Sequence, residues 1–477
     1  MRRRTKIVAT IGPASGSANM IGQLLDAGVN VFRLNFSHGS ADGHRQQAQI
    51  IRQVSEEKGR YVAILGDLQG PKIRVGDLTT DPMPLTEGAD IILSTDPGKA
   101  GNPDIVPIHY KPLPESVGPG DTLLLDDGLI RLQVNRVDGK DVHCTILQGS
   151  TLKSRKGLNR LGGGLSAPAI TEKDMADIDL AAEIGVDYLA VSFPSSADDL
   201  KPVRQKLEVL NANIEIVAKI ERAEAVATDE ALLDIIEAAD GVMVARGDLG
   251  VEIGDAQLMG IQKKIIRLSR QANRPVITAT QMMESMINSP VPTRAEVFDV
   301  ANAVLDRSDA VMLSAETATG KYPVKVVKAM SEACMGAEKH PDMFRSSYRV
   351  NRIFNDIDEA TAMSAIYAAD HVRGIAAIIC LTESGNTALM MSRLSTGLPI
   401  YAMSRHVRTC QRVALYRGVI PLHFDVTEVG GDVYETALNN LGKRGFIQVG
   451  DRVTITCGDI SGQGGCTNTL KILEYKG

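Results

Sequence analysis

Two short segments of the sequence carry charged side chains at spacings that suit phosphate and metal chemistry. Lys219 and Glu221 stand two residues apart at the end of the apolar run Ile214 to Ile220, and Asp248 follows the run Gly241 to Ala245. Residues two apart on a strand share a face, so the first two side chains are predicted to point the same way. Two carboxylates, with water and substrate oxygens as further ligands, are typical of protein Mg²⁺ sites. The pattern predicts a divalent-metal site beside an ammonium group.

Polar residues also follow the ends of other apolar runs. They are Arg33, Asn35, Ser37 and His38; Asp67; Arg246; Thr280 and Gln281; and Ser314, Glu316 and Thr317. A lone polar group at such a place is as often structural as functional, but a repeated pattern favours one shared site. Arg33, Arg74 and Lys219 with a divalent cation would suit phosphoryl oxygens. Since no GxxxxGK[ST] motif occurs, side chains and metal are expected to hold the phosphate.

Eight apolar runs with helix-length amphipathic stretches between them account for the first 320 residues. They are Lys6 to Ile11, Val29 to Leu34, Val62 to Gly66, Tyr188 to Phe193, Ile214 to Ile220, Gly241 to Ala245, Pro275 to Thr280 and Ala310 to Ser314. This alternation predicts an α/β fold, a (β/α)8 TIM barrel. Reactive groups of such barrels lie at the C-terminal ends of the strands, where the polar residues above are found.

The alternation is interrupted once and then ends. Residues 71–165 are rich in Gly, Pro and strand-like alternation, which predicts a small β-barrel domain inserted between the third and fourth strands. The catalytic barrel is therefore expected to comprise residues 1–70 and 166–343. Residues 344–477 begin a new series, with strands IAAIICL, PIYAMS, VIPLHF and RVTITCG, and are predicted to form a three-layer α/β domain.

Composition narrows the class of ligand. The chain has 477 residues with 44% hydrophobic residues and a formal net charge of −6, which gives no support to nucleic-acid or anionic-membrane binding. No apolar run approaches the length of a membrane span, and the basic N-terminus lacks a signal-peptide core. Six scattered cysteines without metal-ligand spacing suit a reducing cytoplasm. Small-molecule substrates are expected.

Seven segments, in this order, give the chain a close resemblance to one family. They are TKIVATIGPAS, VFRLNFSHG, GDLQGPKIRVG, IVAKIERAEAV, GVMVARGDLGVE, TATQMMESM and MLSAETATGKYP. Over essentially its whole length the sequence resembles pyruvate kinases. The resemblance implies transfer of the phosphoryl group of phosphoenolpyruvate to ADP, giving pyruvate and ATP, with Mg²⁺ or Mn²⁺ as cofactor, in a cytoplasmic, allosteric homotetramer.

The resemblance also implies a role for each matching residue. Lys219 would stabilise the phosphoryl group in flight, and Arg33 would contact it. Glu221 and Asp248 would hold the divalent metal. Thr280 would sit where the enolate carbon accepts its proton, through a water relay because a hydroxyl is too weak an acid. The substrate carboxylate would lie against the backbone of Ala245, Arg246 and Gly247, and the nucleotide against Asn35, Ser37, His38 and Arg74.

One segment departs from the better-known members of the family. Lys72 stands in GPKIR where members that need a monovalent cation generally carry Glu. The family's potassium ligands, Asn35, Ser37, Asp67 and the carbonyl of Leu68, are all present. A fixed ammonium can supply the charge that K⁺ would bring, so K⁺ is expected to be dispensable. The alternative is that Lys72 is a solvated surface lysine beside an occupied cation site.

A hydroxyl-rich turn in the C-terminal part is a candidate effector site. It consists of Thr382, Glu383, Ser384, Gly385, Asn386 and Thr387, between a predicted strand and a helix-like segment. Such a turn at a helix N-terminus can hold phosphate, although ordinary N-capping gives the same pattern. By resemblance this is the loop that binds a phosphorylated effector.

Two alternatives remain open at this stage. A lysine at a barrel strand end is also typical of Schiff-base keto-acid aldolases. A catalytically inactive relative that binds metabolites as a regulator is the second, although Arg33, Lys219, Glu221, Asp248 and Thr280 are all retained.

Overall fold

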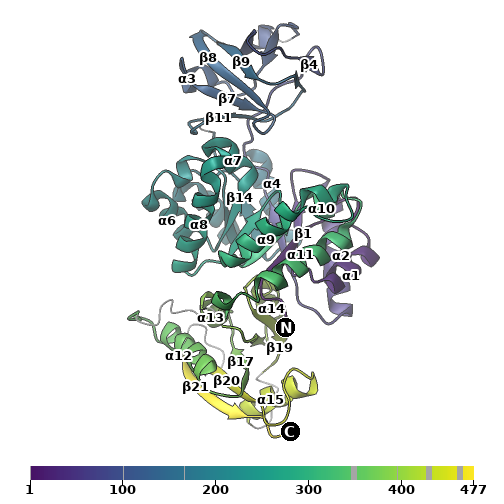
Figure 1. Cartoon of the computed structure of the whole chain (residues 1–477), viewed down its shortest axis with the longest axis vertical. Coiled ribbons are helices and arrows are strands. Elements are labelled where there is room, and N and C mark those ends of the chain that lie inside the picture. The colour runs from purple at the N-terminus through teal and green to yellow at the C-terminus, as the bar shows by residue number, and fades with distance from the viewer. Residues whose placement is uncertain are drawn as a thin grey trace.

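The computed structural model describes residues 2–99, 101–165, 167–344, 352–394, 396–425, 432–458 and 466–477. Three parts lie along the long axis of the molecule: the inserted β domain at one end, the barrel in the middle and the C-terminal domain at the other end (Figure 1). Among the described residues, no helix combines the length and the apolar character that crossing a membrane requires.

Eight parallel strands close into a barrel, as predicted. In barrel order they are β1 (Lys6–Thr10), β2 (Val31–Asn35), β3 (Ala63–Asp67), β12 (Tyr188–Val191), β13 (Glu215–Ile220), β14 (Gly241–Ala245), β15 (Val276–Ala279) and β16 (Ala310–Leu313). Each agrees with a predicted run to within two residues. The strands are almost wholly buried because helices cover their outer faces and side chains fill the interior.

The helices of the barrel follow the strands in sequence. They are α1 (Ala18–Ala27), α2 (Ala41–Glu57), α4 (Glu172–Glu183), α5 (Lys201–Val209), α6 (Asp229–Ala238), α7 (Arg246–Ile253), α8 (Asp255–Gln271), α9 (Arg294–Leu305), α10 (Ala315–Ala318) and α11 (Pro323–Ala337). Polar caps fix where several of them begin. Thr171 and Asp174 form a reciprocal capping box at α4, and Thr293 and Glu296 form another at α9.

The inserted domain is built from short strands around its own core. Its sheets have the orders β11-β7-β8-β9-β5-β6 and β10-β4. The elements are β4 (Met83–Pro84), β5 (Asp90–Ser94), β6 (Ile105–Pro107), α3 (Leu113–Ser116), β7 (Thr122–Leu125), β8 (Ile130–Asp138), β9 (Asp141–Gln148), β10 (Thr151–Leu152) and β11 (Leu158–Arg160). Arg74 bridges to Gly157 beside one edge strand, and Val75 bridges to Ile108 beside the other. This segment links the two edges and closes the sheet into the predicted small barrel.

The C-terminal domain is a sheet with helices on both faces. Its strands have the order β19-β18-β17-β20-β21. The elements are α12 (Ile357–His371), β17 (Ile375–Leu381), α13 (Asn386–Arg393), β18 (Ile400–Ser404), α14 (Val407–Val413), β19 (Val419–His423), α15 (Val433–Lys443), β20 (Arg452–Gly458) and β21 (Thr467–Glu474). Ile378 packs with α12 and α13, whereas Ile379 packs with α15, which gives the three layers. The four predicted strands are confirmed, but β21 was not predicted because this antiparallel edge strand is half exposed and has no apolar run.

Candidate active site

Polar side chains lie on the inner face of the barrel at the C-terminal ends of several strands. Arg33 pairs with Thr10 and Leu65, Asp67 pairs with Ala190, and Lys219 pairs with Met243, so these side chains share the face of the buried interior residues. Asp67 and Lys219 are the last inward residues of their strands, and Arg33 is followed on the same face by Asn35 at the end of β2. The alternation that fills the barrel with apolar side chains therefore ends in a polar layer at its C-terminal mouth.

Lys219 lies at the centre of that layer. Its Nζ atom is 2.9 Å from Oε1 of Glu221 and 3.3 Å from Oδ1 of Asp67, and it donates a hydrogen bond of 2.6 Å to Oγ of Ser192. Burial alone would lower the pKa of Lys219, but the charges of Asp67 and Glu221 outweigh burial and raise the pKa above its usual value. The ammonium group is thus permanently charged. The contact with Glu221 confirms the predicted shared face.

Asp67 joins Lys219 to Arg33. Nε of Arg33 lies 2.6 Å from Oδ2 of Asp67, and Nη1 of Arg33 donates a hydrogen bond of 3.0 Å to Oγ1 of Thr10. Burial would raise the pKa of Asp67, but Lys219 and Arg33 more than offset that effect and lower it. Asp67 thus holds two cationic side chains at the mouth of the barrel, and both are of the kind that binds anionic oxygens.

Glu221 is buried at the next position around the mouth. Its Oε2 accepts a hydrogen bond of 2.8 Å from the backbone N–H of Phe193. Burial raises the pKa of Glu221 to about 7; Lys219 opposes the rise, whereas the negative charge of Asp248 adds to it. A buried carboxyl group beside a second carboxylate is stabilised in its charged form by a bound cation. Both predicted metal ligands thus lie within electrostatic reach of one another.

Asp248 is paired with Lys72 of the inserted domain. The Nζ atom of Lys72 lies 2.8 Å from Oδ1 of Asp248 and 3.7 Å from Oδ1 of Asp127. Burial would lower the pKa of Lys72, but Asp248 outweighs burial and raises it. Lys72 therefore lies at one of the two carboxylates that are expected to hold the divalent metal. Among the described residues, it has no hydrogen bond or ion pair with the expected potassium ligands.

The expected potassium ligands are already engaged with the protein. Oδ1 of Asn35 accepts from the backbone N–H of Ser37 at 3.2 Å, and the carbonyl of Leu68 accepts from Oγ of Ser192 at 2.8 Å. Asp67 pairs with the two cations described above. Asn35 and Asp67 end the neighbouring strands β2 and β3, and Ser37 and Leu68 follow those strands.

Thr280 lies at a strained turn after β15. Its φ of 69° is in the left-handed region, which is unusual for a β-branched residue. Oγ1 of Thr280 accepts a hydrogen bond of 2.8 Å from the N–H of Gly247 and donates one of 2.6 Å to the carbonyl of Ala279. Arg246 holds the turn, because its Nη2 donates to the carbonyl of Thr280 at 2.7 Å while Asp299 pairs with its guanidinium group at 2.7 Å. The side chain of Arg246 thus supports Thr280.

Residues expected on the nucleotide side come from two parts of the molecule. Ser37 and His38 follow β2, and the His38 side chain is exposed. Arg74 is exposed on the inserted domain and donates a hydrogen bond of 3.1 Å to the carbonyl of Arg155. Among the described residues, Arg74 has no hydrogen bond or ion pair with the barrel.

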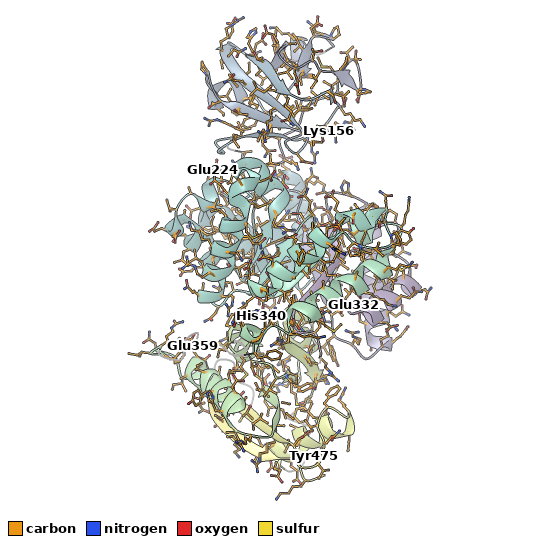
Figure 2. All side chains as sticks on the ribbon, viewed as in Figure 1. Lys156, Glu224, Glu332, His340, Glu359 and Tyr475 are labelled. Atoms are coloured by element: carbon orange, nitrogen blue, oxygen red, sulfur yellow. The ribbon has the colours of Figure 1, made fainter. Side chains whose placement is uncertain are left out.

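Three successive glycines and a buried glutamate form part of the connection between the inserted domain and the barrel. Gly162, Gly163 and Gly164 all have φ between 81° and 94°. Glu252 of α7 accepts from the N–H of Ala223 at 2.8 Å and from Asn159 of the inserted domain at 3.3 Å. Figure 2 shows Lys156 at the lower edge of the inserted domain and Glu224 at the facing edge of the barrel.

The candidate effector turn has the predicted place before a helix. Thr382 accepts from the N–H of Gly385 at 2.9 Å, and Asn386 begins α13. The Glu383 side chain pairs with Arg405 at 3.0 Å and with His406 at 2.7 Å. The hydroxyl groups of Thr387 and Thr467 are 2.7 Å apart, which ties the turn to β21. Ser384 accepts from the N–H of Asn386 at 3.4 Å.

Two residues of the polar layer were not singled out from the sequence. Ser192 links Lys219 to the carbonyl of Leu68, and Thr10 holds Arg33. Both stand at the C-terminal ends of predicted strands. Their polar side chains at these positions are therefore the sequence signal by which they could have been found.

Comparison with known proteins bears on both parts of the chain. Residues 2–327 match the family model "Pyruvate kinase, barrel domain", and residues 359–473 match "Pyruvate kinase, alpha/beta domain". Pyruvate kinase II of Salmonella typhimurium is 55% identical over 475 residues, covering 99% of both chains. Pyruvate kinase of Haemophilus influenzae is 53% identical over 476 residues, covering 99% of this chain and 98% of its own. The crystal structure of a pyruvate kinase from Cryptosporidium parvum superposes with a TM-score of 0.91 at 35% identity, covering 99% of this chain and 96% of that one.

Proposed function

The chain belongs to the pyruvate kinase family, and on this premise we propose how its residues divide the work of the reaction. The protein is a phosphotransferase that passes the phosphoryl group of phosphoenolpyruvate to ADP, giving pyruvate and ATP in the last step of glycolysis. The observation that carries the proposed roles is the permanently charged ammonium of Lys219, held at the barrel mouth by Asp67, Glu221 and Ser192.

Lys219 stabilises the phosphoryl group as it moves between substrates. Its charge is fixed before substrate binds, so little reorganisation is needed when negative charge develops on the equatorial oxygens. Arg33 contacts the same group, because Thr10 and Asp67 hold its Nη1 and Nε and leave Nη2 to face a phosphoryl oxygen.

Glu221 and Asp248 would hold the divalent cation, Mg²⁺ or Mn²⁺. The raised pKa of buried Glu221, caused by burial and by the charge of Asp248, fits such a group. When bound, the cation supplies positive charge that neutralises and orients phosphoryl and substrate oxygens. Lys72 must give up or share Asp248 when the cation binds, because both need the same carboxylate.

The other end of the substrate lies against α7 and Thr280. The backbone of Ala245, Arg246 and Gly247 at the start of α7 receives the substrate carboxylate, where the helix N-terminus favours negative charge. Thr280 stands beside Gly247 and orders the water that protonates the enolate carbon. The hydrogen bonds of Oγ1 with Gly247 and Ala279 keep the hydroxyl group at this place despite the left-handed backbone at Thr280.

Asn35, Ser37, His38 and Arg74 bind the nucleotide. The first three lie on the loop after β2, and Arg74 belongs to the base of the inserted domain. Closure of that domain brings the two groups together and excludes water from the phosphoryl group.

Lys72 replaces the monovalent cation, so the enzyme works without K⁺. It is the charged residue at the base of the inserted domain that contacts the metal carboxylate Asp248. The expected ligands, Asn35, Ser37, Asp67 and Leu68, serve the protein's own contacts instead.

A phosphorylated effector binds the turn formed by Thr382, Glu383, Ser384, Gly385, Asn386 and Thr387. The support is the position of this turn before α13, where backbone N–H groups face the ligand. The enzyme acts as a cytoplasmic homotetramer; five buried cysteines, Cys144, Cys334, Cys380, Cys410 and Cys457, are free thiols, in keeping with a reducing compartment.

One assay tests these roles against the alternatives. Pyruvate formation from phosphoenolpyruvate should require both ADP and a divalent cation, and borohydride with pyruvate should leave Lys219 unmodified. An imine-forming lysine needs a lowered pKa, whereas that of Lys219 is raised by Asp67 and Glu221. ADP-independent turnover, trapping of Lys219 or absence of turnover would overturn the assignment.

A further inference from the structure

The loop after β2, residues 36–39, carries two of the side chains proposed to bind the nucleotide, Ser37 and His38. The loop ends at Ser40, whose side chain caps α2, and Gly39 turns the chain with a φ of 88°. Among the described residues, neither the Oγ atom of Ser37 nor the ring of His38 has a hydrogen-bond partner. Both groups are available to a ligand, so the backbone of the loop decides where they meet it.

His44 of α2 holds the backbone of this loop. Its Nε2 atom lies 2.9 Å from the carbonyl oxygen of His38. Side chains of a helix lean toward the helix N-terminus, and His44 stands in the first turn of α2, so its ring reaches back over the start of the helix to the loop. Because a carbonyl oxygen can only accept, Nε2 is the donor, and a neutral ring at this place carries its proton on Nε2.

The surroundings of His44 fix both the charge and the plane of its ring. Burial lowers the pKa of His44, and the hydrogen bond to His38 only partly opposes this effect, so the ring is neutral at pH 7. The rings of Phe36 and His44 meet edge to face, with centroids 5.0 Å apart and an interplanar angle of 72°. Phe36 is itself buried. The imidazole ring is therefore held in the orientation that directs its single N–H group at the loop.

A second donor reaches the same loop from α4. Nζ of Lys173 donates a hydrogen bond of 2.7 Å to the carbonyl of Phe36, and it pairs with Asp177, one turn later on α4, at 2.6 Å. The helix α4 follows the inserted domain in the sequence, whereas α2 precedes it. Two carbonyls of the loop are thus held by side chains from two different helices, while the side chains of Ser37 and His38 are left for the ligand.

We propose that His44, together with Lys173, is a positioning residue for ADP, because it fixes the backbone of the loop from which Ser37 and His38 reach the nucleotide. This inference rests on the proposed role of those two side chains in nucleotide binding. His44 acts through the carbonyl of His38 and not on the ligand itself. The groups proposed to bind phosphoenolpyruvate belong to other elements, such as β13 and α7, so loss of the His44 hydrogen bond should weaken ADP binding selectively.

Three substitutions of His44 in the full-length protein separate the hydrogen bond from the ring. His44→Phe keeps a ring beside Phe36 but has no donor. His44→Gln places an amide N–H as many bonds from Cα as Nε2, and His44→Asn carries the same amide on a side chain that is one carbon shorter. Steady-state kinetics give kcat and the KM of each substrate, and calorimetry with Mg²⁺ present gives the Kd of ADP.

His44→Phe and His44→Asn should raise the KM and the Kd of ADP about fivefold, the size expected for the loss of one hydrogen bond. The kcat and the KM of phosphoenolpyruvate should stay within about twofold of wild type, since the hydrogen bond serves the nucleotide loop alone. His44→Gln should restore ADP binding. Lys173→Met removes the donor to the carbonyl of Phe36 and should also weaken ADP selectively, so it tests the inference even where circular dichroism shows that a His44 variant is unfolded.

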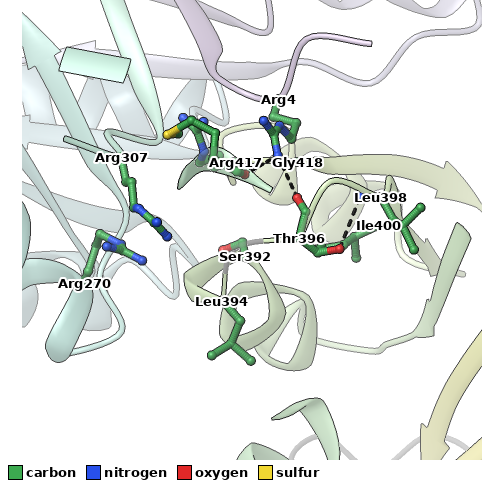
Figure 3. Close-up of a pocket in the computed structure, with 11 residues that line it drawn as sticks. Arg4, Arg270, Arg307, Ser392, Leu394, Thr396, Leu398, Ile400, Arg417 and Gly418 are labelled. Carbon is green, nitrogen blue, oxygen red and sulfur yellow. Dashed lines mark hydrogen bonds between the residues drawn. The ribbon is translucent and has the colours of Figure 1, made fainter. Parts of the chain in front are cut away.

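His371→Phe is the matched control. Nδ1 of His371 lies 2.8 Å from the carbonyl of Tyr367, and the two rings stack with centroids 4.1 Å apart, so this change also removes one hydrogen bond and keeps a ring. His371 belongs to the C-terminal domain, which a closely packed seam joins to the barrel. At the seam Arg4 donates to the carbonyl of Thr396 at 2.8 Å, and the cavity beside them, of about 20 Å³, has room for about one water-sized group (Figure 3). His371→Phe should bind ADP as wild type does.

A variant that carries both Ser37→Ala and His38→Ala separates this inference from the role of the loop itself. If ADP binds more weakly to that variant but normally to His44→Phe and Lys173→Met, the inference is overturned and the nucleotide role of the loop is kept. Normal ADP binding to the double variant would overturn both. Equal losses in all three His44 variants, or equal losses for ADP and phosphoenolpyruvate, would show that His44 supports only the fold and would also overturn its positioning role.

Discussion

The Nζ atom of Lys72 lies 2.8 Å from Oδ1 of Asp248, so an ion pair ties the start of the inserted domain to the residue that follows strand β14 by three positions. Asp248 raises the pKa of Lys72 despite the burial of the ammonium group. Because Asp248 is also a proposed metal ligand, the ammonium and the divalent cation compete for one carboxylate.

Lys72→Gln should therefore tighten divalent-cation binding in the absence of substrates. Removing the competing charge is expected to raise the affinity for Mn²⁺ about tenfold, or roughly 1.4 kcal/mol. Electron paramagnetic resonance of free Mn²⁺ gives the affinity directly. Lys156→Gln is the matched control, since Lys156 pairs with Asp126 at 2.7 Å in the same domain. Unchanged or weaker Mn²⁺ binding in Lys72→Gln would contradict the competition.

The second prediction concerns K⁺. The enzyme should keep near-full activity in buffer free of Na⁺ and K⁺ when Mg²⁺ is present, and Lys72→Glu should create a requirement for K⁺. A cation about 4 Å from the ammonium would meet a repulsion of ~4 kcal/mol at an effective dielectric constant near 20, before screening. A tenfold or greater loss of wild-type activity when a bulky organic cation replaces K⁺ at constant ionic strength would refute the substitution.

Lys219→Met should abolish phosphoryl transfer while leaving phosphoenolpyruvate binding mostly intact. The ammonium matters most for the moving phosphoryl group, so its loss is expected to raise the barrier by several kcal/mol, on the order of a thousandfold in rate. Exchange of the methyl hydrogens of pyruvate, which depends on the enolate step, should survive. Circular dichroism must show a folded variant, because Asp67 and Glu221 lose their shared partner. A variant that keeps more than about a tenth of wild-type turnover, which corresponds to a rise in the barrier of less than ~1.4 kcal/mol, would contradict this role for Lys219.

The inserted domain should close over the barrel mouth when Mg²⁺, ADP and a phosphoenolpyruvate analogue bind together. Gly162, Gly163 and Gly164 supply the left-handed backbone of the hinge, and the Lys72 to Asp248 pair must rearrange. Small-angle scattering should report a smaller radius of gyration, and hydrogen exchange should slow at residues 71–76 and 158–165. Scattering and exchange that do not change on ligand addition would count against closure.

Lys6 should make stability depend on pH. Burial, with the charges of Arg3 and Arg60, lowers the pKa of Lys6 to about 7. Between pH 7 and the pKa of 10.5 that Lys6 has in the unfolded chain, the unfolded chain binds more protons than the folded protein does. The free energy of unfolding therefore rises with pH, by at most about 1.4 kcal/mol per pH unit. Thermal unfolding from pH 7 to 9.5 should show this rise for wild type and a smaller one for Lys6→Met. Lys201→Met, at a 68% exposed position, is the control. Equal slopes for Lys6→Met and wild type would contradict the lowered pKa of Lys6.

The sequence alone was enough to predict the eight barrel strands and most of the polar layer at their ends. Runs such as Gly241 to Ala245 are apolar throughout because a parallel strand is buried on both faces, and this local pattern needs no knowledge of distant contacts. Strand polarity then places Lys219, Glu221 and Asp248 at one end of the barrel, since all C-terminal ends of a parallel barrel meet there.

Partnerships between distant segments were decided only by the tertiary structure. Asp67 joins Arg33 to Lys219, and Lys72 pairs with Asp248; the sequence predicted neither pairing. Local hydrophobic periodicity reflects which face of an element is buried, whereas the choice of charged partner depends on how whole elements are placed in space, which spacing along the chain does not encode.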